Sequence, residues 1–243
     1  MAQRERLATL ISGGGTTMQE IIKSTRSGEV PIDIACVIAS KPSAGGIEKA
    51  RKLGIPESDI IVISPNDFRR ADGEVDQDEF GYAMLEKTQS RDATIVTQNG
   101  YLPLTPGVFI DAYPGRIFNQ HPGPLPDFGG EWMYGRRVHA VRLIFTRLTK
   151  RDKWTEAVAH RVTRELDAGA VVGSARVDIL PEDTVDDLQQ RVLPVEHQTQ
   201  IDLLKDIVGD RVTEQPRETL LKPGEEVILY VAKLAAKQLY PHG

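Results

Sequence analysis

The chain has 243 residues, of which 40% are hydrophobic and 27% are charged, and this balance excludes a disordered or fibrous protein. Its formal net charge of -5 gives no general attraction to nucleic acid or to anionic membranes. Because the sequence has one cysteine, no secretory cleavage signal and no run near the roughly 20 apolar residues that cross a bilayer, we expect a cytoplasmic globular protein.

The first hundred residues alternate between predicted strands and helices. Apolar runs predict strands at 6–11, 32–40, 58–63 and 92–98, and helical spacing predicts helices at 18–30, 44–55 and 77–90. This alternation is typical of the α/β class, as a Rossmann-like, mostly parallel sheet with helices on both faces. Ligands of such sheets bind beyond the carboxyl ends of the strands.

The second half of the chain has a different character. A short strand at 115–120 and a helix at 133–148 precede two valine-rich segments, 156–163 and 169–179, which predict a late antiparallel pair. A long helix follows at 181–208, with Thr184 as its N-cap. We expect one domain over residues 1–222 and an amphipathic helix at 223–243 packed on it.

Several residues outside the main motifs have simple interpretations. The basic residues between Arg136 and Arg151 predict a solvated helix face, with nucleic-acid contact as the alternative. His139 and His160 are interpreted as packed histidines. Cys36 lies in an apolar strand and is expected to be a buried, inert thiol.

A glycine-rich segment, "SGGGTT" at residues 12–17, separates the first strand from the first helix. Backbone amides at a helix amino end bind phosphate well, and threonine hydroxyls add donors. A plain tight turn is the alternative. Met18 stands where a dinucleotide motif needs its third glycine, and the Gly-Lys-Ser/Thr ending of a P-loop is missing, so NAD and ATP are disfavoured.

The stretch "FNQHPGPLPDFGG" at residues 118–130 carries the second candidate site. Strand alternation places Asn119 and His121 on one face, where both side chains could donate to one developing oxyanion. We hypothesise that Asp167, in the turn between the late strands, orients His121 and raises its pKa. The alternatives are that His121 caps the proline turn, or that "PGPLP" is a polyproline ligand.

Together these segments resemble the phosphoribosylglycinamide formyltransferase family, the folate-dependent enzymes of purine biosynthesis. The resemblance runs in order through "LISGGGTTMQEII", "SKPSAGGIEKARKLGIP", "FNQHPGPLPDFGG", "VTRELDAGAVV" and "RVLPVEH". The combination of Asn-x-His-Pro with a later Leu-Asp-x-Gly is characteristic of the wider formyltransferase group.

The resemblance implies a role for each motif. Asn119 and His121 would be catalytic, and Asp167 would support the histidine. Glu196 would contact the glycinamide end of the substrate, although from its helix position alone it belongs to a solvated pair with His197. The implied substrate-binding residues are Gly13, Gly14, Gly15, Thr16, Thr17 and Glu196, and those for the cofactor are Tyr101, Leu102, Pro103 and Leu104.

The implied reaction is formyl transfer from the co-substrate 10-formyltetrahydrofolate to the amine of 5'-phosphoribosylglycinamide. Asn119 and a protonated His121 would stabilise the tetrahedral oxyanion. No metal, nucleic acid or membrane is implied, and the protein is expected to be a monomer or homodimer with small-molecule substrates.

Other functions remain open at this point. Methionyl-tRNA formyltransferase would need a carboxyl-terminal RNA-binding domain, and formyltetrahydrofolate hydrolase would need an amino-terminal regulatory domain. The length of the sequence disfavours both. A non-catalytic folate or nucleotide binder is a rival that the intact Asn119, His121 and Asp167 disfavour. The chain departs from the family in its bulky Glu131 and Trp132 and in the longer segment between Arg136 and Trp154.

Overall fold

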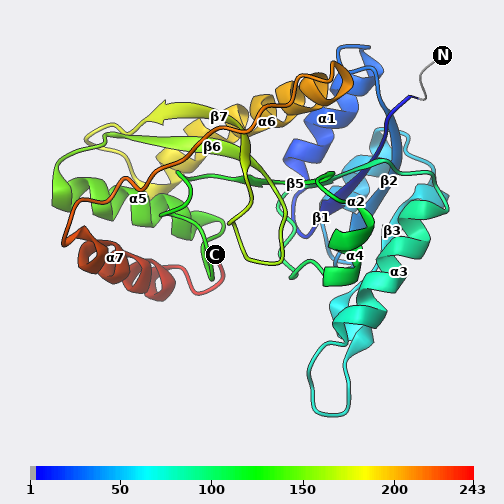
Figure 1. The fold of residues 1–243 in the computed structure, drawn as a ribbon, viewed down its shortest axis with the longest axis horizontal. Coiled ribbons are helices and arrows are strands. Elements are labelled where there is room, and N and C mark those ends of the chain that lie inside the picture. Colours follow the sequence, from blue (N-terminus) through cyan, green and yellow to red (C-terminus); the bar gives the residue numbers. More distant parts are fainter. Residues whose placement is uncertain (1–3) are drawn as a thin grey trace. The chain divides into compact units, whose positions relative to one another are not determined.

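The computed structural model describes residues 4–243, so residues 1–3 of the predicted domain lie outside the described residues. Seven strands form a sheet in the order β3-β2-β1-β4-β5-β6-β7 (Figure 1). The strands are β1 Arg6–Ile11, β2 Asp33–Ala39, β3 Ile60–Val62, β4 Ile95–Gln98, β5 Ile117–His121, β6 Trp154–Arg161 and β7 Val171–Asp178.

The helices follow the predicted order with additions. The α-helices are α1 Thr16–Arg26, α2 Gly46–Lys52, α3 Gln77–Gln89, α4 Gly107–Ala112, α5 Arg136–Thr149, α6 Val185–Val208 and α7 Glu225–Leu239, and the 3-10 helices are Glu57–Asp59 and Pro65–Phe68. Helix α4 was not predicted, because six residues are too few to show helical periodicity. The α/β class is confirmed.

The chain separates into two compact units, one of residues 1–119 with 204–211 and one of residues 120–203 with 212–243. In the first unit β1 pairs in parallel with β2 and β4, and β2 pairs in parallel with β3. A core of Met18, Ile22, Val37, Ile47 and Ala50 joins α1 and α2 to β2. The near-continuous apolar sequence of β1 and β2 suits parallel strands that are buried on both faces.

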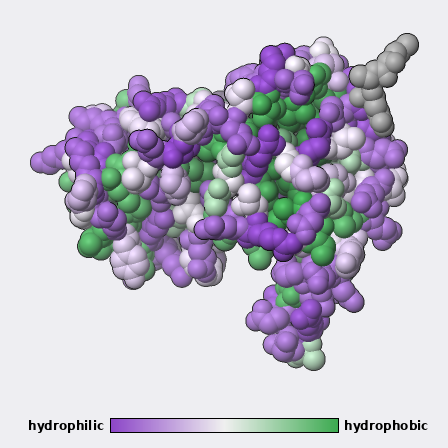
Figure 2. Space-filling model, viewed as in Figure 1, coloured by the Kyte–Doolittle hydropathy of each residue, from purple (hydrophilic) through white to green (hydrophobic). Residues whose placement is uncertain are grey.

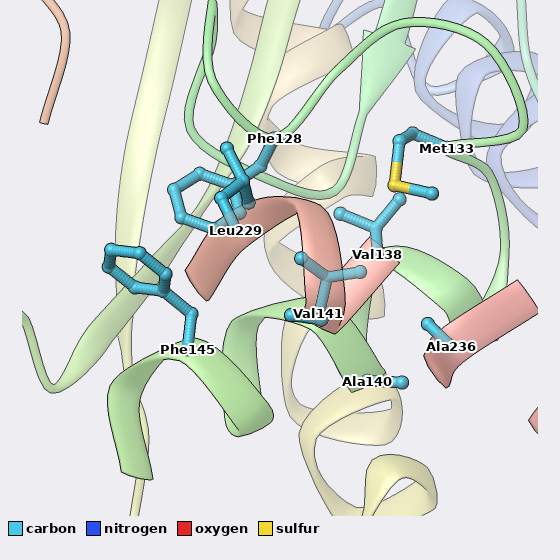
Figure 3. Close-up of a cluster of buried hydrophobic side chains, with 9 residues drawn as sticks. Phe128, Met133, Val138, Ala140, Val141, Phe145, Leu229 and Ala236 are labelled. Atoms are coloured by element: carbon cyan, nitrogen blue, oxygen red, sulfur yellow. The ribbon is translucent and has the colours of Figure 1, made fainter. Parts of the chain in front are cut away.

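The second unit is built around an antiparallel pair and two packed helices. Strands β6 and β7 run antiparallel, with Trp154 opposite Asp178, which confirms the predicted late pair. Figure 3 shows how α5 and α7 pack, with Val141 and Phe145 facing a cluster that includes Leu229. Helix α7 therefore packs against α5, while the domain over residues 1–222 and the division at residue 223 stay predictions.

Thr184 begins α6 as predicted. The Asp187 N–H donates to Thr184 Oγ1 at 3.2 Å, and the Thr184 N–H donates to Asp187 Oδ2 at 3.0 Å. This reciprocal pair is a capping arrangement that satisfies backbone donors which a helix start leaves open.

The solvated interpretation of the basic segment 136–151 is wrong for two of its arginines. Arg137 is 2% exposed and Arg142 is 0% exposed. Arg137 Nε donates to Tyr240 O at 2.8 Å, and Arg142 Nη2 donates to Asp152 O at 2.8 Å while its guanidinium lies 4.2 Å from the Phe128 ring centroid. Buried guanidinium groups are tolerated here because backbone carbonyls and aromatic faces replace water.

Two other interpretations agree with the structure. Cys36 is buried, and burial raises the pKa of its thiol to about 12, as expected for an inert side chain. His139 is also buried, and burial lowers its pKa to about 4.

The surface is mainly polar on the face shown in Figure 2, with hydrophobic residues in scattered groups. Among the helices of residues 4–243, none combines the length and apolar character that a membrane span requires.

Candidate active site

The glycine segment forms the start of α1 in the first unit. Gly15 is the N-cap, with φ 61, and a Cβ at this position would lie 2.8 Å from the Gly46 Cα. Glycine is therefore required both by the left-handed backbone and by the close approach of α2. A Cβ on Gly13 or Gly14 would meet nothing within 4 Å, so the backbone there has open space for a ligand.

Ser12 connects this loop to the segment after β4. Its Oγ accepts hydrogen bonds from Ser40 Oγ at 2.7 Å and from the Leu102 N–H at 2.9 Å, and its own N–H donates to Gly100 O at 3.1 Å. Thr17 is 3% exposed, so of the two predicted threonine donors Thr16 is the more accessible. The first turn of α1 contains no acidic residue, which keeps its amino end favourable for an anion.

The residues predicted to line the pterin pocket differ in exposure. Tyr101 is buried, and its hydroxyl lies 3.8 Å from the Met84 sulfur of α3, while burial raises its pKa. Leu102 and Leu104 are 55% and 50% exposed, and Pro103 is half-buried. The two leucines therefore present apolar surface, whereas the Tyr101 side chain packs inward. Their role stays a prediction.

Asn119 and His121 lie at the carboxyl end of β5, on one face by strand alternation. His121 is 3% exposed, with its Nε2 2.9 Å from Phe128 O and its Nδ1 3.6 Å from Asp167 Oδ2. The structure thus brings Asp167 to His121 across the long sequence separation. Both ring nitrogens face oxygen acceptors.

Asp167 has a positive φ of 55 and several donors around its carboxylate. The Gly130 N–H donates to Oδ2 at 2.9 Å, and His160 Nε2 lies 3.4 Å from Oδ1. Burial alone would raise the pKa of Asp167, but the charge of His121 and the hydrogen bonds from His160 and Gly130 outweigh it and hold the pKa at about 2. Asp167 is therefore ionised near neutral pH.

His160 was interpreted from sequence only as a packed histidine. It is buried, as expected, but it also contacts the carboxylate of Asp167. The sequence did place His160 on the strand that leads into the Asp167 turn, and this position could have indicated the contact. Sequence reasoning missed it because strand pairing decides which side chains reach the turn.

The expected rise in the pKa of His121 is wrong in its net direction. Burial is the larger effect and lowers the pKa of His121, while the charge of Asp167 acts in the opposite direction. The buried imidazole thus favours its neutral form in the free protein. The free energy of removing the imidazolium from water is larger than its attraction to one nearby carboxylate.

Glu196 on α6 is 7% exposed, so its interpretation as a solvated residue is wrong. Its Oε1 accepts a hydrogen bond from Gln120 Nε2 at 3.2 Å. Burial raises the pKa of Glu196 to about 7, and the Gln120 hydrogen bond acts against this rise. Gln120 points away from the face of His121 by alternation, so Glu196 reaches β5 from its other face.

Within residues 4–243 no group of histidine, cysteine, aspartate or glutamate side chains is arranged to hold a metal ion. In the first unit the amino end of α1 offers backbone N–H donors, which suit an anion. In the second unit His121 is a titratable donor in contact with the ionised Asp167, and such a donor can stabilise developing negative charge.

Residues 5–204 match the Formyl transferase family, and the chain belongs to that family. A protein of Arabidopsis thaliana named phosphoribosylglycinamide formyltransferase, chloroplastic, is 30% identical over 210 residues, which are 86% of this chain and 68% of the relative. Phosphoribosylglycinamide formyltransferase of Haemophilus influenzae is 31% identical over 194 residues, covering 80% and 82% of the two chains.

A solved structure supports the same relationship. Glycinamide ribonucleotide transformylase 1 from Symbiobacterium toebii superposes with a TM-score of 0.74 at 30% identity, covering 89% of this chain and 93% of the other. The resemblance to the phosphoribosylglycinamide formyltransferases is confirmed.

Proposed function

We propose that the protein transfers a formyl group from 10-formyltetrahydrofolate to the amine of 5'-phosphoribosylglycinamide, a step of purine biosynthesis. The observation that carries this proposal is the pair formed by the buried His121 and the partly buried Asp167, with Nδ1 3.6 Å from Oδ2 at the end of β5. The printed names of the relatives support the choice of substrates.

Asn119 and His121 act on the negative charge that develops on the formyl oxygen as the amine nitrogen bonds to the formyl carbon. The loss of one such donor typically costs about 2.7–4 kcal/mol of barrier. Although burial lowers the pKa of His121 in the free protein, a developing anion beside the ring favours the imidazolium, and ionised Asp167 stabilises it.

A proton must also move during transfer. The attacking amine loses one proton, and the leaving nitrogen of the folate gains one as its bond to the formyl carbon breaks. His121 is the titratable group at this strand end that carries the proton, and to do so its Nε2 exchanges Phe128 O for the substrate nitrogen while Nδ1 stays beside Asp167.

The remaining predicted residues bind the two substrates. The open backbone at Gly13 and Gly14, with the amino end of α1, suits the substrate phosphate. 10-formyltetrahydrofolate supplies the formyl group, and the exposed Leu102 and Leu104 suit contact with the flat faces of its rings. Glu196 binds the glycinamide end of the substrate. We further propose a cytoplasmic monomer or homodimer with no nucleic-acid or membrane partner.

The test is a formyl-transfer assay with purified protein, 10-formyltetrahydrofolate and 5'-phosphoribosylglycinamide. We expect formation of the formylated nucleotide together with tetrahydrofolate, and no folate turnover when the amine substrate is omitted. Folate turnover without the amine would indicate a hydrolase. Binding of both molecules without turnover would indicate a non-catalytic relative.

A further inference from the structure

The C-terminal part of the chain, beyond the range that matches the family, contacts the loop that follows His121. The match ends at residue 204, whereas α7 begins at Glu225. Asp127 accepts hydrogen bonds from Thr219 Oγ1 at 2.8 Å and from the Leu220 N–H at 2.6 Å. Figure 3 shows Phe128 and Met133 of the loop in the apolar cluster that α7 completes.

The same loop holds both members of the catalytic pair. Phe128 O lies 2.9 Å from His121 Nε2, and the Gly130 N–H donates to Asp167 Oδ2 at 2.9 Å. Between them, Gly129 packs so closely that an added Cβ would lie 2.8 Å from the Asp167 Cβ. A displacement of this loop would therefore move hydrogen-bond partners of His121 and Asp167 together.

Lys233 of α7 reaches into this arrangement. Its Nζ donates to Gly129 O at 3.0 Å, and the side chain is partly buried. Burial lowers the pKa of Lys233, while Asp127 and Asp167 act in the opposite direction. Its positive charge also acts on His121. The charged and titratable groups that influence the pKa of His121 are Asp167, His160 on β6 and Lys233 on α7. Besides burial, His121 in turn lowers the pKa of His139 on α5.

We propose that Lys233 is a positioning residue for the formyl transfer: by holding the Gly129 carbonyl it fixes the loop that orients Asp167 and His121. This inference rests on the proposed function, and it gives α7 a role in the reaction besides packing. Because Lys233 touches neither reacting group, it acts through the Gly129–Gly130 backbone and through its charge.

The test compares Lys233→Met with Lys233→Arg, which keeps the charge and the donor. We expect Lys233→Met to lower kcat about tenfold with little change in either KM, the size expected for one charge-assisted hydrogen bond, and Lys233→Arg to recover most of the loss. Lys87→Met on α3, whose Nζ donates to the exposed Glu86 at 2.7 Å, is the matched control and should not change kcat.

A measurement that does not depend on turnover distinguishes failure of the proposed formyl transfer from failure of the proposed role of Lys233. Loss of the Lys233 charge removes an effect that lowers the pKa of His121, so an NMR titration should show a higher His121 pKa in Lys233→Met than in the wild type. If the wild type shows no transfer, the proposed function fails while the titration still tests the positioning role.

An unchanged kcat and an unchanged His121 titration in folded Lys233→Met would overturn the inference. If Lys233→Met shows no cooperative thermal unfolding, Lys233→Gln takes its place in both measurements. A lower kcat in Lys233→Gln but not in Lys233→Arg supports the proposal. Equal kcat in the wild type, Lys233→Gln and Lys233→Arg contradicts it.

Discussion

The buried His121 and the partly buried Asp167 each influence the pKa of the other. Asp167→Asn keeps the shape of the side chain but removes the charge that opposes the burial effect on His121, so the pKa of His121 should fall further. We expect kcat to fall by about a hundredfold or more. The thermal unfolding temperature should also fall at neutral pH, because the lowered pKa of Asp167 means that its charge stabilises the folded protein. Exposed Asp72→Asn is the control, and near-normal turnover in Asp167→Asn would refute the mechanism.

Glu196 predicts a dependence of stability on pH. Because its pKa is raised from 4.5 to about 7 in the folded protein, its stabilising contribution is complete below pH 4.5 and is lost as the pH rises through 7. Glu196→Gln avoids the buried charge, so it should be more stable than the wild type at pH 8, by up to about 3 kcal/mol, and about equally stable at pH 4.

Urea unfolding of both proteins at the two pH values measures this difference. If Glu196 binds the glycinamide end of the substrate as proposed, the same variant should also have a higher KM for the nucleotide substrate, since the amide lacks the carboxylate charge. Equal stability of the two proteins at pH 8 would show that the Glu196 carboxylate is solvated after all.

At the scale of elements, the start of α1 contains two glycines with different requirements. Gly15 is required by the fold, whereas Gly13 has open space around it. Gly15→Ala should lower the unfolding temperature, because φ 61 costs a side chain roughly 1–2 kcal/mol and the Cβ would meet Gly46. Gly13→Ala has open space, so its stability should be unchanged while KM for the nucleotide rises. Steady-state kinetics and thermal unfolding of the two variants check this contrast, and the reverse pattern would exclude the phosphate role.

The same scale shows what local sequence can predict. Apolar periodicity placed the strands and long helices, and the Thr184 cap and the late antiparallel pair were found where expected. Local sequence could not place His160 beside Asp167, because that contact depends on the pairing of β6 and β7. It also misjudged Arg142 and Glu196, since charge suggests solvent whereas their burial is decided by packing between elements.

For the molecule as a whole, α7 completes the core of the second unit. Leu229 is 7% exposed within that core, and Leu229→Ala should lower the free energy of unfolding by about 2–5 kcal/mol. Leu234 on the same helix is 46% exposed, and Leu234→Ala should change the free energy of unfolding by less than about 0.5 kcal/mol. Urea denaturation measures both, and equal losses would mean that α7 does not pack on α5 as described.

The hydroxyl of Ser12 has a consequence for how the substrates influence each other. Ser12 Oγ, directly before the glycine loop, accepts hydrogen bonds from Ser40 Oγ and from the Leu102 N–H. The glycine loop predicted to bind phosphate and the segment 101–104 predicted to bind the folate therefore share one hydrogen-bonded junction. We expect a shift of either segment to displace this oxygen and, with it, the other segment. Any change that the nucleotide makes in folate affinity must then be matched, by the same factor, in the effect of folate on nucleotide affinity.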